Sequence, residues 1–394
     1  MTQPAAPQEV WITGIGLVSS LGEGPAPHLA ALAAPPAPVL DEAGFAPFPI
    51  HPLPALNLDA QIPKRGDQRQ MEPWQRLGTY AAGLALDGAA ARALVGDMHL
   101  LVAAGGGERD SALDEQVCAA IAGLPPAEAA VRLNEMLASG LRPTLFLAQL
   151  SNLLAGNVSI VHGVTGSSRT FMGEEAAGAD AVRIAALRLA EGRGGIALAG
   201  GAYVAGRWDM LLAYSGAAGV LWRGPGSVPA AERQARGGGM VLGSGGAFLV
   251  LETAAYARAR GTPGIARLTA IAATASRRRD ADTALAAARR LAAPLLPRLA
   301  PGYAVVSAGT GIAAPHAAEQ EFLAWLRDGG AAQGAVATTG DHIGHTVEAA
   351  FPASLALAAL LVQAGRAPQA LVSGFGMWRG EALALVEPIP ESEA

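Results

Sequence analysis

The amino-acid sequence predicts a layered α/β fold. Apolar runs that are typical of buried strands end in glycine-containing turns, and segments with apolar residues at helical spacing follow them. Such an alternation of strands and helices is typical of helices packed against sheets. The chain has 394 residues, of which 51% are hydrophobic, and this is enough for a large buried core.

Strand and helix signals follow one another along the first half of the chain. A proline-rich stretch at 33–63 excludes regular elements, and we interpret it as a long surface excursion. Around it we predict a strand at 10–22, a helix at 72–94, a strand at 99–107, a helix and then a short strand within 140–162, a strand, turn, helix and strand between 167 and 204, and a strand and helix at 237–261.

The second half repeats this alternation. Strand signals at 264–274, 303–311, 334–345, 369–376 and 382–388 are interspersed with helix signals at 284–300 and 348–365. In each half, an apolar strand ends in a glycine-rich turn whose residues could line a shared cleft. We therefore predict two related halves, residues 1–255 and 256–394.

Composition excludes several classes of function. A net charge of −5 argues against a nucleic-acid partner, because phosphate binding needs a clustered positive surface. Cys118 is the only cysteine, so a disulfide and a cysteine-based metal site are excluded, and its helical context indicates a small buried thiol. The N-terminus lacks a secretory pattern, and no apolar run reaches the ~18 residues of a membrane span. We expect a cytoplasmic protein without a membrane span, metal or cofactor.

Residues 167–193 have the pattern of a nucleophile's position at the start of a helix. Small residues lead into a turn, and the turn opens a long amphipathic helix. The turn holds Gly173, Glu174 and Glu175, so a carboxylate stands where a nucleophile would be activated. From the residues alone, the simpler interpretation is a capping carboxylate, which the helix dipole favours by ~0.3–1 kcal/mol.

Six segments occur in an order that resembles a known enzyme family. They are VWITGIGLVSSLG, NLLAGNVSIVHGVTG, ALAGGAYV, GGAFLVLE, GHTVEAA and SGFG. Their order and spacing are similar to those of β-ketoacyl-acyl carrier protein synthases of the thiolase fold, over nearly the whole chain. The resemblance implies a thiolase-like fold with duplicated α-β-α-β-α layers.

Those synthases use a Cys-His-His triad, and the resemblance implies that only part of it remains. Glu175 stands at the position of the acyl-accepting cysteine, Ala308 at that of the first histidine and His345 at that of the second. The lysine expected shortly before the second histidine is missing. The family's gating loop is represented by Gly374, Phe375, Gly376 and Met377. A carboxylate cannot hold an acyl group as a thioester, so we predict that condensation is lost.

The resemblance therefore implies a chain-length factor, a ketosynthase-like subunit without the cysteine that forms a heterodimer with an active ketosynthase. Aromatic polyketide chain-length factors usually have glutamine at that position, and the segment GVTGSSRTFMGEEAAGADAVRIA is similar to the corresponding proteins of aryl polyene pathways. The implied partners are an active β-ketoacyl synthase and, mainly through it, an acyl carrier protein. The basic run at 276–282 is a weak candidate for carrier contact or a solvated helix start. The implied wall of the partner's tunnel is Leu145, Phe146 and Leu150.

Two other functions stay open at this point. One is decarboxylation of malonyl-acyl carrier protein to supply a primer, although Glu175 would repel the malonyl carboxylate and Ala308 lacks a donor for the thioester carbonyl. The other is a binding module without a synthase partner, which predicts a stable homodimer.

Most of the histidines have a structural interpretation. We expect His345 to form an ion pair or a charge-assisted hydrogen bond with Glu175. Asp341 and His342 are interpreted as turn residues, and His316 as a surface residue at a helix start. No two histidines have convincing metal-ligand spacing.

Overall fold

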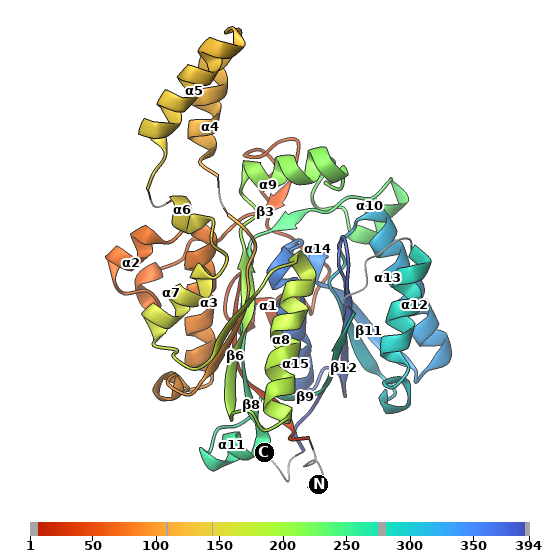
Figure 1. Cartoon of the computed structure of the whole chain (residues 1–394). Coiled ribbons are helices and arrows are strands. Elements are labelled where there is room, and N and C mark those ends of the chain that lie inside the picture. The colour runs from red at the N-terminus through yellow and green to blue at the C-terminus, as the bar shows by residue number, and fades with distance from the viewer. Residues whose placement is uncertain (1–6, 108, 144, 275–280, 391–394) are drawn as a thin grey trace, which may run out of the picture.

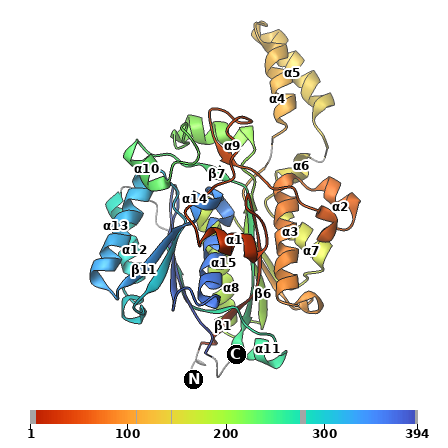
Figure 2. The same cartoon turned by 180° about the vertical axis from the view of Figure 1, so that it is seen from behind.

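The computed structural model of the chain describes residues 7–107, 109–143, 145–274 and 281–390 (Figure 1), and Figure 2 shows it from behind. Its strands are β1 (Val10–Ser19), β2 (Gly22–Glu23), β3 (Ile50–His51), β4 (His99–Ala103), β5 (Ser168–Phe171), β6 (Ile196–Tyr203), β7 (Leu242–Gly243), β8 (Gly245–Thr253), β9 (Ala266–Ala273), β10 (Tyr303–Ser307), β11 (Gln333–Thr338), β12 (Ala370–Phe375) and β13 (Glu381–Glu387).

The helices are α1 (Pro25–Ala31), α2 (Arg65–Gln70), α3 (Pro73–Gly88), α4 (Ser111–Ile121), α5 (Pro126–Gly140), α6 (Leu145–Ala148), α7 (Leu153–His162), α8 (Glu174–Ala190), α9 (Trp208–Ala213), α10 (Ala230–Ala235), α11 (Ala254–Ala259), α12 (Ala281–Ala292), α13 (Ala313–Gly329), α14 (Thr339–Ile343) and α15 (Ala350–Gln363). Short helical turns are η1 (Leu58–Ala60), η2 (Arg92–Leu94), η3 (Tyr214–Ala218), η4 (Leu296–Arg298) and η5 (Val347–Ala349).

The strands of the two halves pair in the same order. In the first half, β1 is antiparallel to β8, β8 is antiparallel to β6, and β6, β4 and β5 run parallel. In the second half, β9, β13, β12, β10 and β11 repeat this series of directions. A short antiparallel contact between β1 and β9 joins the two sets of strands. We propose that the halves divide near residue 255, between β8 and β9.

Two central helices lie between the two sets of strands, and other helices cover the outer faces (Figure 1). α8 packs against β4, β6 and β9, and α15 packs against β8, β10, β12 and β13. Every residue of α15 from Ala350 to Val362 is buried, as expected for a helix that is apolar all round. α3 covers the first set of strands, and α12 and α13 cover the second. The layers therefore follow the order α-β-α-β-α.

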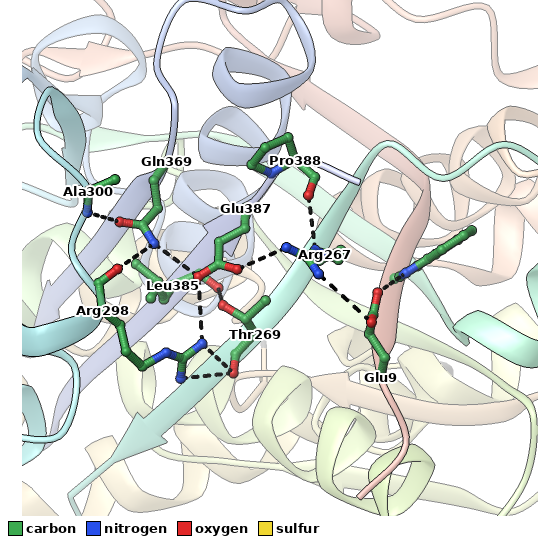
Figure 3. Close-up of polar contacts among 10 residues, drawn as sticks. Glu9, Arg267, Thr269, Arg298, Ala300, Gln369, Leu385, Glu387 and Pro388 are labelled. Carbon is green, nitrogen blue, oxygen red and sulfur yellow. Dashed lines mark hydrogen bonds and ion pairs between the residues drawn. The ribbon is translucent and has the colours of Figure 1, made fainter. Parts of the chain in front are cut away.

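A polar network links the ends of several strands (Figure 3). The Glu387 carboxylate accepts hydrogen bonds from Arg267 at 3.2 Å and from Gln369 at 2.9 Å. Arg298 lies 3.6 Å from the same carboxylate, and Arg267 also lies 3.9 Å from the carboxylate of Glu9. Because Glu9 immediately precedes β1, the network connects β9 and β13 with the first half of the chain.

The prediction for residues 140–162 is wrong in detail. Residues 149–152 separate α6 from α7, and the residues assigned to a short strand form the last turns of α7. Leu154, Ala155 and Val158 are buried on α7, which packs against α3. Burial at helical spacing therefore outweighs the strand preference of the β-branched residues.

α4 and α5 form a hairpin, here called the arm, which projects from the body (Figures 1 and 2). Burial within the described part of these two helices is limited to Leu113 and Val117 of α4. Cys118, predicted to be buried, is exposed. The prediction is wrong because the arm offers no core against which this face of α4 can pack.

Two further expectations are corrected by burial. The proline-rich stretch is anchored and not only superficial, because Phe48, Ile50 and Ile62 are buried and β3 pairs with β7. His316, predicted on the surface, is buried where α13 packs against α10. Residues 276–280 of the basic run lie outside the described residues. No helix in the described ranges is long and apolar enough to cross a membrane.

Candidate functional site

Glu175 lies in the first turn of α8, just beyond the end of β5. Gly173, with a φ of 132°, turns the chain into the helix. Glu174 follows with a φ of 52°, a conformation that is strained for a residue with a side chain. Glu175 comes next and is buried. The turn and the helix start that the sequence predicted are therefore present, and their second glutamate faces the interior.

The Glu175 carboxylate meets His345 from the second half of the chain. Nε2 of His345 lies 2.7 Å from Oε1 of Glu175, and both side chains are buried. Because an ionised carboxylate can only accept, the imidazole Nε2 carries the proton and donates. The expected contact between these two residues is confirmed.

Backbone donors add to this contact. The N–H groups of Glu175 itself and of Met377 also donate to the Glu175 carboxylate. Burial alone raises the pKa of Glu175, but His345 and the two N–H groups together hold that pKa below its usual value. Converging N–H groups of this kind stabilise a developing oxyanion in acyl-transfer sites. Here the chain's own carboxylate occupies them.

Little space remains around this carboxylate. Ala308, which directly follows β10, lines a cavity of about 10 Å³ together with Glu175, Gly374 and Phe375. Such a volume is about that of one water molecule, so an acyl chain does not fit. The methyl group of Ala308 also provides no hydrogen bond toward the cavity.

The segment of residues 374–377 packs directly against the site. A Cβ atom on Gly376 would lie 3.2 Å from Oε2 of Glu175, and the Gly376 N–H donates to the Gly380 carbonyl at 3.0 Å. Phe375 and Met377 are both buried. This segment therefore closes the site in the described conformation.

A second buried carboxylate, which sequence reasoning missed, follows His345 in the chain. Glu348 lies in η5 after Val347, whose φ of 43° is an outlier for a β-branched residue. A Cβ atom on Gly105 would lie 2.6 Å from Oε1 of Glu348, so a glycine provides the space for this side chain. The signal in the sequence was the single charge in the run 347–362, which is otherwise apolar except for Ser354.

Burial changes the protonation of this cluster. It raises the pKa of Glu348 to about 8, and the charges of Glu175 and Glu174 add to the increase. Burial and the charge of Glu175 also raise the pKa of Glu174, while Arg379 opposes this. The site therefore combines one ionised carboxylate with a second that is mostly protonated at neutral pH.

The other predicted residues lie away from this pair. Leu145 and Phe146 lie on α6 and Leu150 follows it, and none of the three lines the cavity at Glu175. Asp341 and His342 lie in the short helix α14 and not in an open turn, and Asp341 accepts from the Ala230 N–H at 2.7 Å. Within the described ranges, no three His, Cys, Asp or Glu side chains are grouped to hold a metal ion.

Comparison with known proteins gives one family match. The family "Beta-ketoacyl synthase, N-terminal domain" matches residues 54–257 of the chain. No curated protein gives a significant match to the sequence.

Solved structures resemble the chain over nearly its whole length. "The ishigamide ketosynthase/chain length factor" has a TM-score of 0.79 at 17% identity, with 98% of this chain and 100% of that chain covered. A β-ketoacyl synthase from Burkholderia phymatum STM815 has a TM-score of 0.74 at 19% identity, with 97% and 100% covered. The AntDE:AntF complex, a type II PKS acyl-carrier protein with its ketosynthase bound to the hexaketide, has a TM-score of 0.72 at 14% identity, with 97% and 100% covered. The chain therefore has the thiolase-like fold of ketosynthases.

Proposed function

Because the chain belongs to the β-ketoacyl synthase family, we propose that it is a non-catalytic, chain-length-factor-like subunit. It pairs with an active β-ketoacyl-acyl carrier protein synthase and shapes that partner's acyl tunnel in type II polyketide or aryl polyene biosynthesis. The observation that carries the proposal is the buried Glu175 carboxylate, bonded to His345 at 2.7 Å, at the start of α8.

Glu175 supports the loss of acyl chemistry in three ways. It has no sulfur for a thioester, and a mixed anhydride at this carboxylate would hydrolyse readily. Its carboxylate already takes the hydrogen bond of His345 and the N–H of Met377. The cavity of about 10 Å³ beside it leaves no room for an acyl group.

The edge of the first sheet supports a partner subunit. Within the described residues β5 pairs only with β4, and Ser168 and Arg169 on β5 are exposed. Such an edge is a template for a strand from another chain. Phe146 on α6, Ile160 on α7 and Met172 after β5 are 69%, 71% and 66% exposed. Large apolar side chains left in water favour an interface that covers them.

The names of the similar structures support the partners. One is a ketosynthase/chain length factor, and another is an acyl-carrier protein in complex with its ketosynthase. For this chain we propose the corresponding pairing with a ketosynthase, with the carrier protein bound mainly through that partner. Leu145, Phe146 and Leu150 would then face the partner's tunnel, and their volume would limit product length.

Co-expression with the intact ketosynthase encoded nearest to this chain tests the pairing. We expect a 1:1 complex by light scattering, and aggregated or unstable protein when the chain is expressed alone, because a large apolar half-interface is poorly tolerated in water. A well-behaved monomer would count against the proposal.

A substitution at the edge strand sharpens this test. The carbonyl groups of Ser167 and Phe171 accept from β4, so the alternation of the strand turns the N–H of Thr170 to the open edge. Thr170→Pro should therefore leave the β4 pairing intact and abolish the complex. Thr170→Ala is the matched control and should assemble normally.

A further inference from the structure

Arg233 of α10 is a buried cation that forms no ion pair with the described residues. It is 2% exposed, and α10 packs against α13 (Figures 1 and 2). Its Nε–H donates to the Gly239 carbonyl at 2.9 Å, and Nη1 donates to the Val228 carbonyl at 2.7 Å. Both acceptors are neutral. An arginine side chain stays ionised in a protein, and a buried charge without a counter-charge is costly.

The remaining nitrogen of this guanidinium, Nη2, lies beside the start of α13. A Cβ atom on Gly311 would be 2.7 Å from Nη2, and Gly311 directly precedes Ile312, the N-cap residue of α13. Ile312 provides no side-chain cap, and the first turn of the helix contains no acidic residue. The first N–H groups of a helix have no partner within it and favour an anion. The guanidinium and the helix start therefore favour negative charge at the same place.

His316 in the first turn of α13 is a second group that lacks a partner. It is 1% exposed, and neither Nδ1 nor Nε2 has a hydrogen-bond partner among the described residues. Side chains of a helix lean toward its N-terminus, so the imidazole lies over the same first turn. Burial and the charge of Arg233 lower the pKa of His316 to about 4, so at neutral pH its imidazole is neutral and carries one N–H. Because buried polar groups are almost always paired, this N–H indicates an acceptor that the chain does not supply.

The titratable groups around Arg233 do not neutralise it. Asp341 of α14 acts on the guanidinium from beyond ion-pair distance, and its carboxylate accepts from the Ala230 N–H at 2.7 Å. Burial lowers the pKa of both His51 and His342, so these two imidazoles are neutral at neutral pH. The guanidinium therefore keeps an excess positive charge in a buried place.

The close packing of the surrounding backbone favours a small ion. A Cβ atom on Gly238 would lie 2.6 Å from the backbone nitrogen of Ala313, and the Gly239 N–H donates to the Gly311 carbonyl at 2.8 Å. A phosphate or a carboxylate group needs more room than such contacts leave. A halide ion is smaller, and it accepts hydrogen bonds from several N–H donors at once.

We propose that a chloride ion binds between Arg233 and His316 at the start of α13. The ion accepts hydrogen bonds from Nη2 of Arg233 and from the imidazole N–H of His316, neutralises the guanidinium and ties α10 to α13. The site is formed within this chain and is separate from the pair of Glu175 and His345. Binding there does not depend on the proposed chain-length role, and either proposal can fail without the other.

Diffraction from crystals soaked in sodium bromide tests the position of the ion. The sample is the full chain, crystallised with its ketosynthase where the chain alone is not soluble. Bromide replaces chloride and scatters anomalously. We expect an anomalous peak between Arg233 and His316, at hydrogen-bonding distance from Nη2.

Urea unfolding tests the same site in solution. Chloride is replaced stepwise by isethionate, a larger organic anion, at constant ionic strength. An ion that binds the folded chain and not the unfolded one stabilises the fold in proportion to its saturation. The urea midpoint should therefore rise with the chloride concentration.

Two substitutions of His316 assign both effects to this site. His316→Asp places a carboxylate beside Arg233 that takes the place of the ion, so the bromide peak and the chloride dependence of the midpoint should both be lost. His316→Asn is the matched control, which has nearly the same shape without the charge and can still donate, and it should keep both. If His316→Asp does not fold, His316→Phe removes the N–H and should weaken chloride binding by about three- to tenfold.

Three results would overturn the proposal. One is a bromide map without a peak between Arg233 and His316. Another is a urea midpoint that does not change with chloride. The third is a bromide peak that persists in folded His316→Asp protein, or an unchanged chloride affinity in folded His316→Phe protein.

Discussion

Glu175 and His345 come from different halves of the chain, and their 2.7 Å hydrogen bond joins the start of α8 to the segment before η5. The imidazole and the carboxylate are both buried, so neither can exchange its partner for water. Removing one of them leaves the other unpaired, which costs more than the bond itself contributes. We therefore propose that the pair serves the structure of the closed site.

Substitutions of Glu175 separate this structural role from a chemical one. Glu175→Gln keeps the shape and an acceptor oxygen, so the complex with the ketosynthase should assemble normally. Glu175→Ala leaves His345 without its partner and the helix start without its anion, and should lower the free energy of unfolding by ~1–2 kcal/mol. Urea unfolding of the complex measures the free energy of unfolding for each of the two variants. The yield of product should fall only as far as the stability of the complex falls. A fully assembled Glu175→Ala complex that makes no product would favour the decarboxylase instead.

Glu348 should make stability fall as the pH rises. Its pKa of about 8 in the folded chain lies above the ordinary 4.5, so between these values the folded state holds a proton that the unfolded state has lost. The stabilisation is complete below 4.5 and is lost as the pH rises through 8. Relative to Glu348→Gln, which resembles the protonated form, the free energy of unfolding should fall by ~1.4 kcal/mol per pH unit in this window.

Urea unfolding of the unsubstituted chain and of Glu348→Gln from pH 5 to pH 9 measures the difference in their free energies of unfolding. The comparison cancels the contributions of the titratable groups that both proteins share. Parallel stability curves would show that Glu348 is ionised throughout the range and would contradict the assignment.

Between elements, the network around Glu387 holds β9 and β13 together and reaches Glu9 beside β1 (Figure 3). Glu387→Ala leaves the partly buried Arg267 and the exposed Arg298 without this carboxylate, and should cost about 1–3 kcal/mol of unfolding free energy, chiefly through Arg267. The control is Glu321→Ala, whose ion pair with Arg289 is largely exposed and should cost less than about 1 kcal/mol. Chemical unfolding compares the two variants, and equal losses would show that the network stabilises the fold no more than one exposed ion pair does.

Sequence patterns predicted most elements because the burial of those elements can be read from their own residues. β1 and β8 are continuous apolar runs buried on both faces, and α15 is apolar all round. The patterns failed where burial depends on distant partners. The strand expected at the end of α7 is helical because α3 lies against it. Cys118 is exposed because the arm leaves the body, which helical spacing in one segment does not reveal.

The same limit applies to the site. Glu175 and His345 were found because a family resemblance assigns both positions, and their contact was expected. Glu348 was missed because its burial depends on Gly105, more than 200 residues earlier in the chain, and on the unusual backbone at Val347. No local pattern reports a close approach between such distant segments.

For the whole molecule, the two sets of strands enclose α8 and α15, so the site exists only when both halves are folded together. The open edge at β5 and the arm, which packs little against the body, are surfaces that a partner subunit would cover. We propose that this chain keeps the ketosynthase architecture while a partner subunit carries out the acyl chemistry.

Intact-protein mass spectrometry tests that claim most directly. The 1:1 complex is incubated with acyl- and malonyl-loaded carrier protein, and the masses of both subunits are measured. We expect an acyl adduct on the ketosynthase partner and an unchanged mass for this chain, because Glu175 offers no sulfur and its oxygens are already engaged. A covalent acyl adduct on this chain, mapped to Glu175, would contradict it.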